Sequence, residues 1–133
     1  MSASIYDQNM NVLRVKVPYL ATIMEGLRPD PRLTMILSGE KGASAVYVDN
    51  NGNPILLHSK YDPVREAAKL VDGYRLSPTV NVVMLGFGLG YHVLDLVSRR
   101  NAHDFIVICE RNPQIIRAAL EHVDLRPLFE KRN

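Results

Sequence analysis

The pattern of apolar and polar positions begins with a helical stretch. Between residues 12 and 27, apolar side chains recur close to the spacing of an α-helix, and Pro18 must lie in a first turn or interrupt the pattern. We therefore predict a helix over residues 18–26, ending at Gly26 with two prolines just beyond it. Residues 1–11 are polar and rich in turn formers, which predicts a loose terminus or a segment that orders only against a partner.

A middle region has the pattern of short strands joined by tight turns. The predicted strands are residues 33–37, 45–48 and 54–57. The linkers between them are rich in Gly, Asn and Asp, which tolerate the backbone angles of hairpin turns, and Asn51-Gly52 is the sharpest of these signals. This region is therefore predicted to be an antiparallel β-meander.

The second half alternates between helical and strand patterns. Asp62-Pro63 is typical of a helix start, because Asp accepts from free N–H groups of a first turn and Pro lacks an N–H; this helix continues to Gly73. The nearly continuous apolar run over residues 80–85 is typical of a parallel strand buried on both faces. A second buried strand is predicted over residues 105–109.

These elements follow the order of half a Rossmann-type unit. A glycine-rich turn and a helix over residues 91–99 join the two strands, and Asn112-Pro113 opens a last helix that runs to about residue 122. The predicted fold class is α/β, with a small antiparallel β-meander followed by a partial Rossmann-like (βαβα) unit. The predicted parts of this one domain are an N-terminal segment with one helix (1–32), the meander (33–60) and the Rossmann-like half (61–133).

Composition narrows the class of protein. The 133 residues, 47% hydrophobic and 23% charged, suit one globular domain. A net charge of +2, from 16 basic and 14 acidic residues, argues against a nucleic-acid or membrane surface. The chain has no apolar run near the roughly 20 residues of a membrane helix. Its single cysteine, Cys109, excludes an internal disulfide and is expected to be a small core residue. We expect a soluble, cytoplasmic protein.

The strongest candidate site is the glycine-rich turn. Gly86, Gly88 and Gly90 follow a predicted parallel strand, where backbone N–H groups and the next helix N-terminus favour a phosphate or ribose. Their spacing is G-x-G-x-G, with Tyr91 where the third glycine of a dinucleotide site would stand. Glu110 ends the second strand, in the place of the acidic residue that binds ribose hydroxyls. The candidate cofactor-binding residues are Gly86, Phe87, Gly88, Gly90, Glu110 and Arg111. The alternative is a tight structural turn, with Glu110 stabilising a helix N-terminus.

A second candidate group lies between the meander and the Rossmann-like half. His58, Lys60 and Tyr61 could contact a polar ligand there, or they could belong to a capping and docking linker whose helix cap is Asp62. The remaining histidines, at positions 92, 103 and 122, do not have the spacing of a metal site, and we assign neither a metal site nor a catalytic residue.

Residues 82–90 and 106–113 resemble the cofactor region of S-adenosylmethionine-dependent methyltransferases, including the spermidine-synthase branch. That resemblance implies S-adenosylmethionine as a ligand of the glycine turn and Glu110. A nucleotide is the other candidate ligand.

The sequences of three segments resemble the N-terminal region of the motility accessory factor (Maf) family. They are residues 57–67 (with His-Ser-Lys-Tyr-Asp-Pro), 85–92 and 109–113, and the resemblance extends over about residues 33–125. Maf proteins are associated with flagellin glycosylation by nonulosonic acids and are related to archaeal 6-hydroxymethylpterin pyrophosphokinase-like proteins. The resemblance implies a sugar-nucleotide transferase domain downstream, as a partner of this region.

Three functional hypotheses remain open. In the first, the chain is a non-catalytic or incomplete N-terminal domain of a Maf-type glycosyltransferase, with a positioning or nucleotide-site-like role. In the second, it is the N-terminal part of a methyltransferase. In the third, it is a structural domain that recruits a partner or forms a homodimer through a sheet edge. Two parallel strands are too few to form the crevice of a nucleotide enzyme. We therefore expect this chain to be the N-terminal part of a longer protein and to lack enzyme activity by itself.

Overall fold

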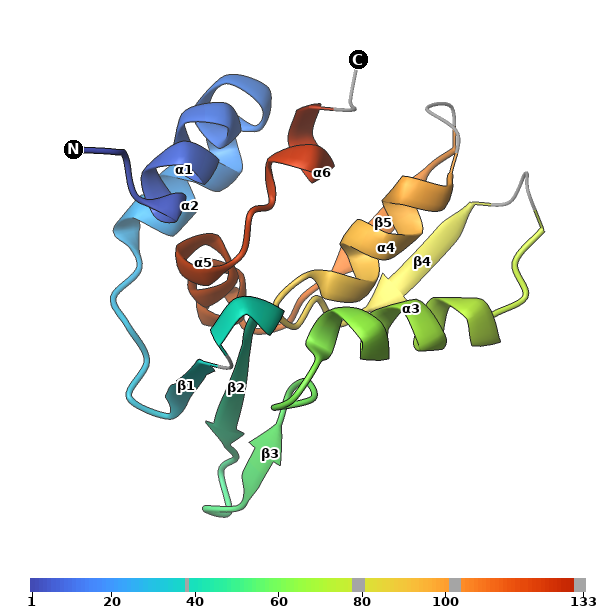
Figure 1. Ribbon diagram of the computed structural model, residues 1–133. Coiled ribbons are helices and arrows are strands. Elements are labelled where there is room, and N and C mark those ends of the chain that lie inside the picture. Colours follow the sequence, from blue (N-terminus) through green and yellow to red (C-terminus); the bar gives the residue numbers. More distant parts are fainter. Residues whose placement is uncertain (38, 78–80, 101–103, 131–133) are drawn as a thin grey trace.

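The computed structural model describes residues 1–37, 39–77, 81–100 and 104–130. Helices near the N-terminus, an antiparallel sheet, and a parallel strand pair with its helices follow one another along the chain (Figure 1). The elements are α1 (Ile5–Lys16), α2 (Pro18–Gly26), β1 (Leu33–Leu37), the 3₁₀ turn η1 (Gly39–Lys41), β2 (Ala43–Val48), β3 (Pro54–Leu56), α3 (Pro63–Gly73), β4 (Val82–Leu85), α4 (Tyr91–Arg99), β5 (Ile106–Cys109), α5 (Pro113–His122) and α6 (Arg126–Glu130).

The antiparallel β-meander is confirmed. Its strand order is β1-β2-β3, so β2 is the central strand and pairs with both neighbours. The turn between β2 and β3 is held by Asp49, whose Oδ1 accepts from the N–H groups of Asn51 and Asn53 at 2.8 Å each. Gly52 has φ +81°, the backbone conformation that the Asn-Gly signal predicted.

The βαβα half is confirmed as well, and with it the α/β fold class. β4 and β5 pair in parallel, from Val82 opposite Ile106 to Leu85 opposite Cys109. α4 is the crossover between these strands and α5 follows the second one. The predicted caps begin their helices, since Asp62 Oδ1 accepts from Arg65 N–H at 3.0 Å and Asn112 Oδ1 from Gln114 N–H at 3.1 Å. Position 80 of the predicted first strand lies outside the described residues.

The expectation of one helix within residues 1–32 is wrong, because the first residues form α1 rather than a loose terminus. A capping box begins this helix: Ser4 Oγ accepts from Asp7 N–H at 3.1 Å, and the Asp7 carboxylate accepts from Ser4 N–H at 3.3 Å. α1 packs against α5 and α6, so the first helix of the chain lies beside its last two helices (Figure 1). The segment therefore orders against the chain's own C-terminal helices.

Asn9 ties α1 to the C-terminal region and is fully buried. Its Nδ2 donates to the carbonyls of Leu120 and Val123 at 2.9 and 2.7 Å, and its Oδ1 accepts from Leu125 N–H at 2.9 Å. All three partners are backbone groups beyond or at the end of α5. The side chain thus satisfies polar groups that would otherwise be buried without partners.

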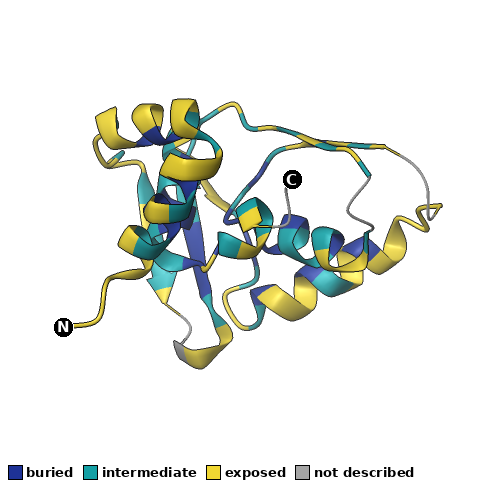
Figure 2. Ribbon diagram, turned by 90° about the horizontal axis from the view of Figure 1, so that it is seen from above, coloured by how far each residue is buried: buried dark blue, intermediate teal, exposed yellow. Residues whose placement is uncertain are grey.

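The core is continuous from the N-terminal helices to the parallel strands (Figure 2). Its fully buried large side chains are Met10, Leu13, Met24, Leu89, Leu96, Leu120 and Leu125.

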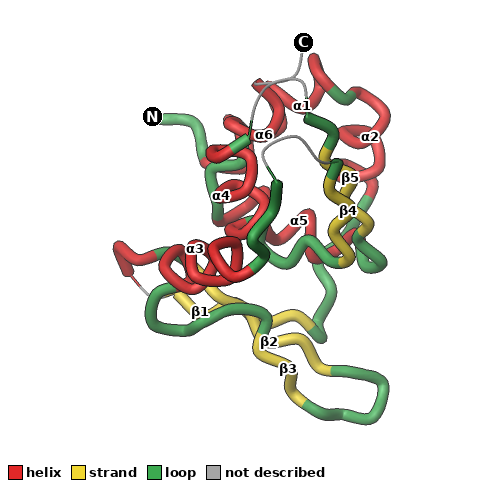
Figure 3. The backbone as a smooth tube through the Cα atoms, turned by 90° about the vertical axis from the view of Figure 1, so that its right-hand side faces the viewer, coloured by secondary structure: helices red, strands yellow, loops and turns green. Residues whose placement is uncertain are grey.

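The expectation that both parallel strands are buried on both faces is wrong. Met84 faces the core, whereas Leu85 and Val83 are exposed. Cys109 is exposed on the same strand pair, so the prediction of a core cysteine is wrong too. The reason is that the described helices pack on only one face of this pair; Figure 3 shows β4 and β5 at a border of the molecule.

Within the part of the chain that the structure describes, no helix is both long and apolar enough to cross a lipid bilayer.

Candidate functional site

The glycine-rich turn connects β4 to α4, and all three of its glycines have positive φ: +96° at Gly86, +55° at Gly88 and +88° at Gly90. Close approach is a second reason for glycine at two of these positions. A Cβ on Gly88 would lie 2.5 Å from His58 Nε2, and one on Gly90 would lie 2.8 Å from the Phe87 ring. The turn therefore packs tightly on side chains of the same chain.

Glu110 follows β5 at the same edge of the strand pair and is half-buried. Its Oε2 accepts from Phe87 N–H at 2.8 Å, and its Oε1 accepts from Asn112 N–H at 2.8 Å. The carboxylate thus joins the glycine turn to the start of α5. The structure brings Glu110 and the turn together as the sequence predicted, whereas Arg111 is exposed beside them.

His58 links the meander to the glycine turn. The side chain is buried, and its Nε2 accepts from Leu89 N–H at 2.8 Å. Its backbone carbonyl accepts from the Ser44 hydroxyl at 2.6 Å, which anchors the segment to β2. Because Nε2 is an acceptor, the ring proton is assigned to Nδ1, which faces Glu66 Oε1 at 3.7 Å.

This environment keeps His58 neutral. Burial lowers the pKa of His58 from 6.5 to about 4; nearby His92 lowers it further, and Glu66 acts in the opposite direction. Burial lowers the pKa of His92 as well. A neutral imidazole is what the Leu89 hydrogen bond requires, because a proton on Nε2 would remove the acceptor.

Tyr91 forms another link to the meander, which sequence reasoning missed. Its buried hydroxyl donates to Ala43 O at 2.7 Å and accepts from Ala43 N–H at 2.8 Å. Its ring meets His58 edge to face, with centroids 5.3 Å apart. A Cβ on Gly42 would lie 2.8 Å from the hydroxyl, so that position needs a small residue. The sequence feature that could have indicated this link is Tyr91 at the start of α4, where a dinucleotide site would have its third glycine.

The other two residues of the second candidate group lie on the surface. Tyr61 and Lys60 are both exposed, and the Lys60 ammonium lies 5.1 Å from the centre of the Tyr61 ring. His58 is buried beneath the glycine turn instead, so the structure does not bring the three residues together in one cavity.

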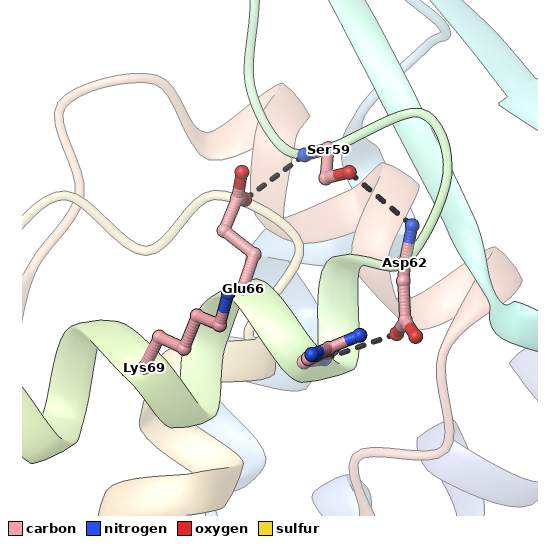
Figure 4. A pocket seen from close by; sticks show the side chains of 5 residues that line it. Ser59, Asp62, Glu66 and Lys69 are labelled. Atoms are coloured by element: carbon pink, nitrogen blue, oxygen red, sulfur yellow. Dashed lines mark hydrogen bonds between the residues drawn. The ribbon is translucent and has the colours of Figure 1, made fainter.

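A shallow hollow lined by polar and charged residues lies beside these residues (Figure 4). It is lined by Ser59, Asp62, Arg65, Glu66 and Lys69. Glu66 Oε1 accepts from Ser59 N–H at 2.9 Å, and Ser59 Oγ accepts from Asp62 N–H at 3.2 Å. With Asp62 capping α3, these groups hold the loop that begins the helix.

The N–H groups of the glycine turn donate within the chain. Phe87 donates to Glu110 and Leu89 to His58, as described above. Gly86 N–H donates to Cys109 O at 2.8 Å, and Gly90 N–H donates to Phe87 O at 3.0 Å. A phosphate site uses such groups to bind the ligand. In this structure, protein acceptors occupy these four donors.

His92 and His122 lie on α4 and α5, and position 103 lies outside the described residues. Across residues 1–37, 39–77, 81–100 and 104–130, no three His, Cys, Asp or Glu side chains are grouped so that they could hold a metal ion.

Comparison with protein families gives a match over residues 62–133, from the cap of α3 to the end of the chain. The matching family is described as the glycosyltransferase Maf N-terminal domain. The chain belongs to this family. The Maf match includes the glycine turn and Glu110 but begins after the meander.

Among solved structures, the chain is similar to the Maf glycosyltransferase from Magnetospirillum magneticum AMB-1. The TM-score is 0.65 and the sequence identity 18%, over 97% of this chain and 25% of that one. This similarity shows a shared fold, and the chain spans about a quarter of the length of that Maf protein. A comparison with curated proteins finds no match. Neither match supports the resemblance to methyltransferases or to pterin pyrophosphokinase-like proteins.

Proposed function

We propose that this chain is the N-terminal positioning domain of a longer, cytoplasmic, motility-associated glycosyltransferase of the flagellin-modifying type, with catalysis located elsewhere in that protein. One observation carries the proposal. The glycine turn directs its Phe87 and Leu89 N–H groups to Glu110 and His58, so its donors hold parts of the domain together. The family match and the one-quarter span of a Maf structure support a domain within a larger protein.

Hydrogen bonds between the three predicted parts of the chain support the proposal that these parts form one domain. His58 and Tyr91 connect the meander (33–60) to the Rossmann-like half (61–133). Asn9 connects the N-terminal segment (1–32) to that half. Each link uses a buried side chain and a backbone group of another part, so we propose that the three parts fold together and present one rigid surface to the rest of the protein.

A nucleotide-site-like role of the glycine turn is the second candidate. The specific observation that favours it is the position of Glu110 and of three positive-φ glycines at the carboxyl edge of two parallel strands. A nucleotide would bind through Gly86, Phe87, Gly88, Gly90, Glu110 and Arg111. It would have to displace the Glu110 carboxylate from Phe87 N–H, because that donor is occupied in the folded chain.

One experiment separates the two roles. The chain is titrated with CMP, ATP and S-adenosylmethionine in a calorimeter, and the unfolding free energies of Glu110→Ala and of Glu40→Ala, a change at an exposed carboxylate, are measured in urea. A positioning role predicts no binding heat and a loss of about 3 kcal/mol in Glu110→Ala only, from two hydrogen bonds to a charged group. Binding heat that Glu110→Ala abolishes would favour the nucleotide role and refute the positioning role.

The cellular part of the proposal has its own test. Flagellin is purified from cells whose Maf-type protein carries or lacks residues 1–133, and its intact mass is measured. We expect the glycan mass to be lost with this domain. Full glycosylation without it, at equal protein levels, would contradict the proposed role.

A further inference from the structure

The parallel strand pair has an apolar outer face. Side chains of alternate positions form it, and in the register of the pair Val83 lies beside Val107 and Leu85 beside Cys109. Leu85 is 85% exposed, Val83 65% and Val107 51%. Phe105, directly before β5, is 69% exposed. We call Val83, Leu85, Phe105, Val107 and Cys109 the outer face.

The opposite face of the same strands is packed into the core. Met84 is buried, and Val82, Ile106 and Ile108 pack against the core cluster to which α4 and α5 contribute. Parallel sheets occur almost only with both faces covered, because crossover helices lie on them. The uninterrupted apolar sequence of both strands suits burial on two faces, whereas the described part of this chain covers one.

We infer that the outer face of β4 and β5 binds an apolar helical segment of the polypeptide that accompanies this domain in a longer Maf protein. The inference rests on the proposed function, in which such a polypeptide exists. The similar Maf structure is about four times as long as the part that this chain matches. A longer Maf protein therefore has enough additional polypeptide to provide a helix that packs on the outer face. A helix is the fitting occupant because helices are what covers the faces of parallel sheets.

The size of the outer face favours a segment of the same polypeptide over a second copy of this chain. The exposed area of its five side chains is on the order of 500 Å², whereas each partner in a stable complex buries about 800 Å². A covalently linked segment loses far less translational and rotational freedom on docking than a separate molecule does. A small apolar face is therefore sufficient for an intramolecular contact.

Cys109 provides a probe of the outer face, since it lies there and is the only cysteine of the chain. The rate of its alkylation is measured by peptide mass spectrometry in the 133-residue chain and in the full-length Maf-type protein. We expect at least about tenfold slower alkylation in the full-length protein, because a covered thiol is shielded from the reagent. Equal rates would overturn the inference.

A pair of substitutions tests the same face without cysteine chemistry. Leu85→Ser changes the outer face, and Leu37→Ser is the matched control at a 72% exposed leucine of β1. We expect similar, small shifts of the urea midpoint for both in the 133-residue chain. In the full-length protein, Leu85→Ser should lower the midpoint of this domain and Leu37→Ser should not. Equal effects of the two in the full-length protein would contradict the inference.

Two further outcomes are distinguishable. Sedimentation of the 133-residue chain should show a monomer; a dimer that Leu85→Ser abolishes would assign the outer face to a second copy and overturn the inference. If the gene encodes no longer Maf-type polypeptide, the proposed function itself fails. Rapid Cys109 alkylation in an existing full-length protein refutes only the docking inference.

Discussion

The buried imidazole of His58 makes the stability of this domain depend on pH. In the folded chain its Nε2 accepts from Leu89 N–H, and burial lowers its pKa from 6.5 to about 4. The unfolded chain therefore binds a proton near pH 6.5, whereas the folded chain resists it until about pH 4. The contribution of neutral His58 to the free energy of unfolding is fully present above pH 6.5. It falls as the pH drops through the window from 6.5 to 4 and is lost near pH 4.

The size of the effect follows from the pKa difference. Each pKa unit corresponds to about 1.4 kcal/mol, so lowering the pH from 7 to 4 should cost the folded chain about 3 kcal/mol through His58 alone. Burial also lowers the pKa of His92, which adds to the loss in the same direction. Nearly one proton per molecule should be taken up on unfolding near the middle of the window.

The assay is urea unfolding at closely spaced pH values, with the native chain compared to His58→Gln. Glutamine offers an amide oxygen near the place of Nε2 and does not titrate, so this variant should lose the part of the pH slope between 6.5 and 4 that comes from His58, and the part from His92 should remain. His122→Gln changes a histidine of α5 outside the neighbouring pair His58 and His92, and it serves as the matched control. An unchanged slope in His58→Gln would refute the reasoning.

Three further changes test the links between the parts, each by the free energy of unfolding in urea. Asn9→Ala should cost about 3–5 kcal/mol, because three buried backbone groups lose their partner, and the exposed Asn11→Ala on the same helix should cost under about 1 kcal/mol. Tyr91→Phe should cost about 1–3 kcal/mol, since both hydrogen bonds to one backbone residue disappear; no loss would contradict the geometry. Gly88→Ala should cost more than Gly52→Ala, because both have positive φ but only the first places a Cβ 2.5 Å from an imidazole nitrogen.

Much of the fold could be predicted from the sequence. The helix start at Asp62-Pro63, the turn at Asn51-Gly52 and the crossover between two apolar strands depend on neighbours within a few residues. The same kind of signal was present for α1 in the Ser4 and Asp7 capping box, but the polar composition around it favoured a loose terminus.

The candidate site was predicted only in part. The sequence placed the glycine turn beside Glu110, and the structure joins them through Phe87 N–H. What it did not predict is the second acceptor, His58, because the imidazole reaches Leu89 from 31 positions away along the chain. The presence of glycine residues shows that the backbone is approached closely, but it does not show whether a ligand or the protein itself approaches.

The sequence by itself therefore determined most local elements between residues 18 and 122, their caps and their order, since periodicity and capping act over one or two turns of chain. Only the tertiary structure decided that Asn9 holds a segment more than a hundred residues away, that protein acceptors occupy four N–H donors of the glycine turn, and that one face of β4 and β5 is left exposed. The physical reason is that hydrogen-bond partners and covered faces depend on which distant segments pack together. Uniformly apolar strands such as β4 and β5 indicate burial without indicating which segment provides it.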